Sequence, residues 1–123
     1  MLVAFSVAPS GGDESGSVHE AVAAAVRIVR DSGLPNHTDS MFTTLEGEWD
    51  EVFDVIRRAT DAVGQYGSRV SLVLKADIRP GYTGQLTAKV ERVEKALAEH
   101  GDAWPGAPRR PSEHASATHR IGE

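Results

Sequence analysis

The chain has 123 residues, 40% of them hydrophobic and 25% charged, which is the composition of one globular domain. It has no cysteine, which excludes disulfide bonds, thiolate nucleophiles and thiolate metal ligands. The net charge of -5 and the lack of a basic stripe interleaved with aromatic residues argue against nucleic-acid binding. No apolar run is long enough to span a membrane, and no basic region precedes the first strand-like stretch, so we expect a cytoplasmic protein.

The first predicted element is a strand over residues 2–8. Larger apolar side chains alternate there with small or polar ones, which is the period of a strand with two unlike faces. The larger set is Val3, Phe5 and Val7, and the smaller set is Ala4, Ser6 and Ala8.

The next element is a helix that begins near Ser17. Ser17 and Glu20 form the pattern of a capping box, and Gly33 followed by Pro35 ends the helix. Apolar residues recur at helical spacing and predict one buried stripe, made of Val18, Val22, Ala25 and Val29.

A hairpin and a second helix are predicted next. Residues 36–48 are long enough for two short strands with a reversal near residues 39–41, although the reversal lacks an Asn-Gly pair. Acidic residues then suit the positive end of a helix that stops at Gly64. Its apolar face contains Trp49, Val52, Phe53, Ile56 and Val63.

The last elements are a strand and a third helix. Residues 70–78 alternate like a strand before Arg79-Pro-Gly turns the chain. An amphipathic helix then ends at Gly101, with Leu86, Val90, Val93 and Leu97 on its apolar face. Residues 102–123 contain three prolines and no periodicity, so we expect a disordered C-terminal tail.

The order β-α-β-β-α-β followed by a helix predicts an α+β fold over residues 1–101. It is the order of a ferredoxin-like split βαβ sandwich, in which two helices cover one face of a four-stranded antiparallel sheet. The other face would then have no helix of its own, which leads us to expect a homo-oligomer.

Four stretches of the sequence carry a resemblance to a known family. They are Phe5-Ser-Val-Ala-Pro9, residues 20–33 (EAVAAAVRIVRDSG), residues 43–52 (TTLEGEWDEV) and residues 70–80 (VSLVLKADIRP), and the match closes at residues 86–91 (LTAKVE). Together they resemble the thiamine-binding protein family. The most specific element is Thr-x-Leu-Glu-Gly-Glu followed by an acidic helix.

The resemblance implies ferredoxin-like domains that assemble into dimers or tetramers. It also implies binding of thiamine or its hydroxymethylpyrimidine part, without catalysis and without a further cofactor. The expected function is therefore sequestration, sensing or delivery of a thiamine-like ligand. A dimeric α+β barrel enzyme, or a structural or regulatory assembly domain without ligand, is the alternative.

Polar residues near the predicted strand ends are candidates for such a site. Ser6 offers a hydroxyl beside small residues, or else faces a subunit partner. Thr43 and Thr44 point to opposite faces, so at most one lines the same pocket as Ser6. Glu46 can accept an amine, or is an ordinary acid before a helix. We expect Ser6, Thr43, Glu46 and Trp49 to come together.

Three further candidates have simpler structural alternatives. Trp49 offers a stacking surface for a heteroaromatic ring, but it also fits a core position. Lys75 either contacts the ligand or pairs with an acid across an oligomer interface. Asn36 either offers its amide to a ring or serves the turn after Pro35. The five histidines show no metal-ligand spacing, so we expect no metal site.

Overall fold

The computed structural model describes residues 1–11 and 17–101 of the chain. The described residues fall into two compact units, Met1–Lys89 and the part from Val90 on, so that the boundary lies within the last helix. The predicted tail, residues 102–123, lies outside the described residues, and the proposed domain boundary at Gly101 stays a prediction.

The first unit contains the predicted ferredoxin-like arrangement. Its sheet has the strand order β2-β3-β1-β4, and all three neighbouring pairs are antiparallel. The strands are β1 (Leu2–Ser10), β2 (Asn36–Thr38), β3 (Thr43–Glu46) and β4 (Arg69–Asp77). The helices are α1 (Ser17–Asp31), α2 (Trp49–Val63), a 3-10 turn η1 (Gly64–Tyr66) and α3 (Gln85–His100).

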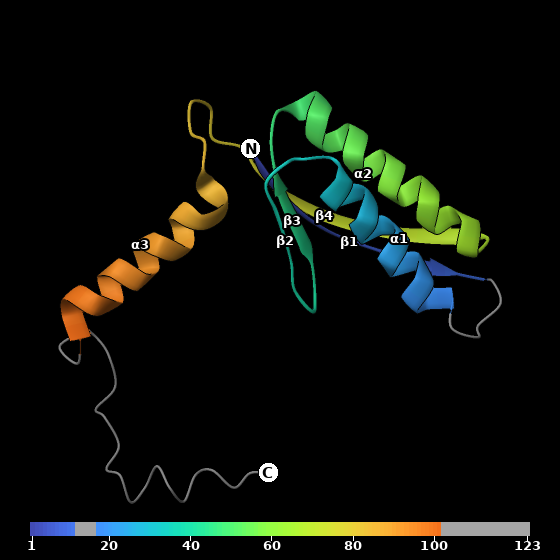
Figure 1. Cartoon of the computed structure of the whole chain (residues 1–123), viewed down its shortest axis with the longest axis horizontal. Helices are drawn as coiled ribbons and strands as arrows, with labels where there is room; N and C mark the ends of the chain where they lie inside the picture. Colours follow the sequence, from blue (N-terminus) through green and yellow to red (C-terminus); the bar gives the residue numbers. More distant parts are fainter. Residues whose placement is uncertain (12–16, 102–123) are drawn as a thin grey trace, which may run out of the picture. The chain divides into compact units, whose positions relative to one another are not determined.

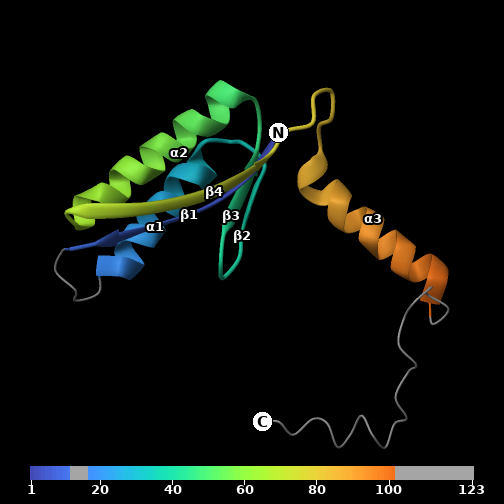
Figure 2. The same ribbon diagram turned by 180° about the vertical axis from the view of Figure 1, so that it is seen from behind.

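Helices α1 and α2 lie together on one face of the sheet (Figure 1), and the view from behind agrees (Figure 2). The alternation read in β1 explains this layer, because Val3, Phe5 and Val7 are all buried and point toward the helices. Leu45 of β3 is fully buried beside Val3 in the register of the two strands. The core of the protein therefore lies between the sheet and the two helices.

The buried stripe of α1 differs from the predicted one. Ala21, Ala25 and Val29 are buried, whereas Val18 and Val22 are 49% and 43% exposed. Ala21 and Ala25 have short side chains, which allow α1 to pack closely against its neighbours at these positions. The valines of the first two turns thus stay at the surface.

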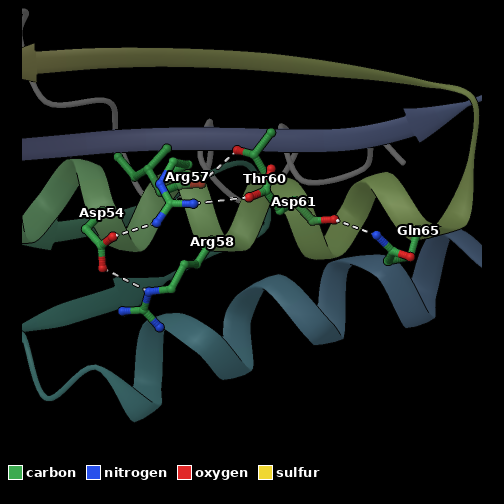
Figure 3. Close-up of polar contacts among 7 residues, drawn as sticks. Asp54, Arg57, Arg58, Thr60, Asp61 and Gln65 are labelled. Atoms are coloured by element: carbon green, nitrogen blue, oxygen red, sulfur yellow. Dashed lines mark hydrogen bonds and ion pairs between the residues drawn. The ribbon is translucent and has the colours of Figure 1, made fainter.

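Helix α2 begins and ends as its sequence predicts. Glu48 and Glu51 form a reciprocal capping box, in which the Glu48 N–H donates to Glu51 Oε1 over 3.1 Å. The outer face carries ion pairs of Asp54 with Arg57 and Arg58, and of Arg57 with Asp61 (Figure 3). These pairs are exposed, which identifies this face as a solvated surface.

The second face of the sheet carries neither α1 nor α2. Ser6 of β1 lies on this face, as do Thr44 and Glu46 of β3 and Lys75 of β4. In the register of the strands, Thr44 and Lys75 are both opposite Ala4, and Glu46 is opposite Leu2. Val73, opposite Ser6, is 57% exposed on this face.

The start of α3 is attached to the sheet through Glu46. Glu46 Oε2 accepts the N–H of Gln85 over 3.0 Å, and Oε1 accepts the N–H of Leu86 over 3.1 Å. Lys89 of the next turn forms an ion pair with Asp77, which lies across Leu2 from Glu46. A side chain of β3 therefore satisfies helix N–H groups that have no partner within the helix.

The apolar face of α3 forms at the predicted helical spacing but is not buried. Val90, Val93 and Leu97 are each more than half exposed. No helix among the described residues is long and apolar enough to cross a membrane.

Candidate functional site

The first candidate site is a hollow at the edge of β1, which we call the notch. Its volume is about 160 Å³, and it lies between β1, α1 and the β2–β3 hairpin. Its lining residues are Phe5, Ser6 and Val7 of β1, Val22, Ala25 and Val26 of α1, and residues 38–43 of the hairpin. A space of this size suits one substituted six-membered ring.

The notch exists because β3 is shorter than β1. Thr43, the first residue of β3, pairs with Phe5, and β1 continues to Ser10. Beyond Phe5, no strand among the described residues pairs with this edge of β1. In an antiparallel strand, the N–H and C=O groups of one residue point to the same side, and those of the next residue point to the other side. Either Ser6 or Val7 therefore presents both of its backbone groups to the notch. A ligand can thus find a backbone donor and an acceptor side by side.

A pair of hydroxyl groups forms the polar part of the hairpin wall. Thr38 Oγ1 and Thr43 Oγ1 are 3.1 Å apart and share a hydrogen bond across the hairpin. Thr43 is only 7% exposed. Two hydroxyls that bond to each other use one of their two hydrogens, so the second remains for another acceptor, such as a ring nitrogen.

Asp39 holds the hairpin turn in place. Its Oδ1 accepts the N–H groups of Met41 and Phe42 over 2.8 and 3.0 Å, and its own N–H donates to the Phe42 carbonyl over 3.0 Å. The N–H groups of Phe42 and Met41 lower the pKa of Asp39 below its ordinary value. This aspartate replaces the Asn-Gly pair that the sequence lacks, since an Asp side chain can itself close a turn.

Exposed apolar side chains surround the notch. Met41 is 70% exposed, Val22 43% and Phe42 36%, and all three are lining residues. Exposed apolar side chains gathered around a hollow with a few polar groups are typical of a ligand site.

A second hollow lies at the opposite end of β3, and we call it the Trp49 hollow. Its volume is about 330 Å³, and its lining residues are Met1, Gly47, Glu48, Trp49 and residues 78–83. The Arg79 guanidinium lies 3.6 Å from the centre of the Tyr82 ring. Trp49 is 55% exposed and stacks on Phe53 with ring centroids 5.0 Å apart, so its predicted core position is wrong.

The four residues expected to form one site do not all come together. Ser6 and Thr43 both line the notch. Trp49 lies beyond the opposite end of β3, a strand whose four residues span about 10 Å. Glu46 lies on the second face, with both oxygens bonded to α3. Its role as a ligand acceptor stays a prediction, and its observed role is structural.

The remaining candidates lie outside the notch. Thr44 and Lys75 are opposite Ala4 on the second face, on either side of β1. The Asn36 amide donates to the Leu34 carbonyl over 2.8 Å, which is the simpler turn role considered from the sequence. Ligand contact by these three residues is untested.

The notch also contains residues that the sequence did not indicate. Thr38, Asp39 and Phe42 belong to the hairpin, and Val22 was assigned to the core. The symmetric placement of Thr38 and Thr43 around a four-residue turn is the signal that could have identified the hydroxyl pair. Within the described parts of the chain, no group of three or more His, Asp or Glu side chains is placed to hold a metal ion.

Comparison with known proteins identifies the family. The sequence profile of the family described as thiamine-binding protein matches residues 3–94. The chain belongs to the thiamine-binding protein family. The protein UPF0045 Mb1933 of Mycobacterium bovis is 54% identical over 98 residues, which cover 79% of this chain and 94% of the relative.

Solved structures of similar proteins agree with this membership. A domain of unknown function, DUF77, from Bacillus cereus is 32% identical with a TM-score of 0.67, covering 74% of this chain and 86% of that one. A Thermotoga maritima protein named as a candidate in thiamine biosynthesis or salvage is 25% identical with a TM-score of 0.61, covering 76% of this chain and 99% of that one. This member of the thiamine-binding protein family thus shares the fold of these relatives.

Proposed function

We propose that the protein binds thiamine or its hydroxymethylpyrimidine part in the notch, without catalysing a reaction. One observation carries the location: a ring-sized hollow where an unpaired strand edge, a hydroxyl pair and apolar side chains meet. An aminopyrimidine presents a donor amine, acceptor ring nitrogens and an apolar face, and each finds a counterpart there. The family and the Thermotoga maritima relative support the ligand class.

The pyrimidine ring fits the notch better than a whole thiamine molecule does. A volume of about 160 Å³ lies below the usual range of pockets that enclose larger ligands. We infer that the pyrimidine enters the notch while the rest of a larger ligand lies at its mouth, against Met41 and Phe42.

The polar groups of the notch favour binding over catalysis. Its side chains offer hydroxyl groups and the Asp39 carboxylate, whose pKa is lowered by the N–H groups of Phe42 and Met41. A carboxylate with a lowered pKa is a weak base near pH 7. We therefore expect sequestration, sensing or delivery of the ligand.

Removing the Thr43 hydroxyl should weaken ligand binding. Thr43→Val keeps the side-chain shape but deletes the hydroxyl that bonds Thr38. A buried polar contact is worth about 1–3 kcal/mol, so we expect at least about a fivefold loss of affinity for hydroxymethylpyrimidine in a calorimetric titration. The Ser6 side chain lies on the second face of the sheet, at the edge of the notch, so Ser6→Ala should weaken binding less than Thr43→Val does.

Two control variants separate this effect from a general loss of stability. Thr60→Val deletes a hydroxyl that donates to the Ile56 carbonyl in α2, away from the notch (Figure 3). Ser71→Ala replaces a serine by alanine as Ser6→Ala does, but on β4, at the position opposite Ala8. Both should bind like the wild type. Equal losses in the test and control variants would contradict a site in the notch.

We also propose that the protein is a homo-oligomer, because the second face of its sheet leaves Val73 57% exposed. Val73→Glu places a charge on this face and should shift the protein toward monomer at micromolar concentration, as measured by light scattering. A wild type that is already monomeric there would contradict the proposal.

A further inference from the structure

The charge on the side chains that line the notch is negative. Among the described residues that line it, Asp39 alone is charged, and no lysine, arginine or histidine is present. His37 is close enough to influence Asp39 electrostatically but does not line the hollow. An ion that enters the notch therefore meets one negative charge and no lining cation.

The Asp39 carboxylate is fixed at the turn of the hairpin. Its Oδ1 accepts two backbone N–H groups, and its Oδ2 has no hydrogen-bond partner within the described residues. An aspartate is ionised near neutral pH at its ordinary pKa, and the bonds from Phe42 and Met41 lower this pKa further. The turn thus presents a permanent acceptor to the ligand.

This arrangement favours the binding of an amine and disfavours the binding of a phosphate. An exocyclic amine or a protonated ring nitrogen can donate to a carboxylate, which strengthens the hydrogen bond. A phosphate ester has only acceptor oxygens and carries about -1.5 to -2 charges at pH 7. In the notch it would lose water and approach a like charge, with hydroxyl and backbone donors but no cation to compensate.

We propose that the notch selects the unphosphorylated aminopyrimidine over its phosphate ester, and that Asp39 sets this preference. The inference rests on the proposed function and deepens it by naming the form of the ligand that is bound. It makes Asp39 a specificity residue in addition to its role in the turn.

Titration of the wild type with hydroxymethylpyrimidine and with its monophosphate tests the preference. At low ionic strength, where charge effects are least screened, we expect the phosphate to bind at least about tenfold more weakly. The difference should narrow as salt is added. Equal or tighter binding of the phosphate would overturn the proposal.

Two variants test the assignment to Asp39. Asp39→Asn keeps an Oδ1 acceptor for the turn but removes the charge, so the preference should fall to within about threefold. Ser40→Lys adds a cation to an exposed lining residue and should tighten phosphate binding even if Asp39→Asn does not fold. Asp61→Asn removes one charge on the outer face of α2 (Figure 3) and should leave the preference unchanged.

The outcomes separate this inference from the proposed function. If the wild type binds neither compound, the proposed function fails, and the preference fails with it. If the free pyrimidine binds and Asp39→Asn keeps the full preference, the pyrimidine site stands and the role of Asp39 is refuted. Phosphate affinity that is unchanged by Ser40→Lys would also count against an electrostatic origin.

Discussion

Replacing Leu45 by alanine should lower the free energy of unfolding by about 2–5 kcal/mol. Leu45 is fully buried on the helix side of β3, and the register places it between Val3 and Asn36. Deleting its side chain leaves a cavity that surrounding atoms fill only partly. Denaturant unfolding followed by circular dichroism measures the change.

Leu72→Ala is the matched control for Leu45. Leu72 lies on β4 opposite Val7 and is 40% exposed, so the same truncation removes much less buried surface. We expect it to cost less than half as much as Leu45→Ala. Similar costs for both would mean that the core does not lie where the structure places it.

Glu46→Ala should release the start of α3. The variant deletes both acceptors of the Gln85 and Leu86 N–H groups, which lie 3.0 and 3.1 Å from the carboxylate oxygens. Leaving such donors without a charged partner costs about 1–3 kcal/mol, which corresponds to a roughly 5- to more than 100-fold change in an equilibrium constant. Hydrogen exchange at these two amides should accelerate by a factor in this range.

A control at α2 tests whether the effect of Glu46 is local. Glu51→Gln weakens the bond from the Glu48 N–H in the capping box of α2, without touching α3. It should accelerate exchange at the start of α2 alone. If Glu46→Ala leaves the amides of Gln85 and Leu86 protected, the carboxylate does not hold the helix.

The strands and helices could be predicted because their signals are local. The alternation in β1 and β4 follows from neighbouring residues, and the acidic residues that mark the start of α2 lie next to it in the sequence. The buried face of α1 was predicted only in part: Ala25 and Val29 are buried as expected, whereas Val22, which fits the same helical spacing, is exposed. Packing against the rest of the fold decides between them.

The candidate site could be predicted only in part. Ser6 and Thr43 were found because the ends of paired strands meet in an antiparallel sheet. The sequence could not show that α3, about forty residues further on, bonds to both Glu46 oxygens. Asp39 was overlooked because its turn pattern gives no indication of the hollow beside it.

A map of backbone NMR shifts on adding hydroxymethylpyrimidine tests the location of the ligand most directly. We predict that the largest shifts occur at Ser6, Val7 and residues 38–43, around the notch. Residues 78–83, which line the Trp49 hollow, should shift little. Shifts concentrated at Trp49 and residues 78–83, or no shifts at saturating ligand, would contradict binding in the notch.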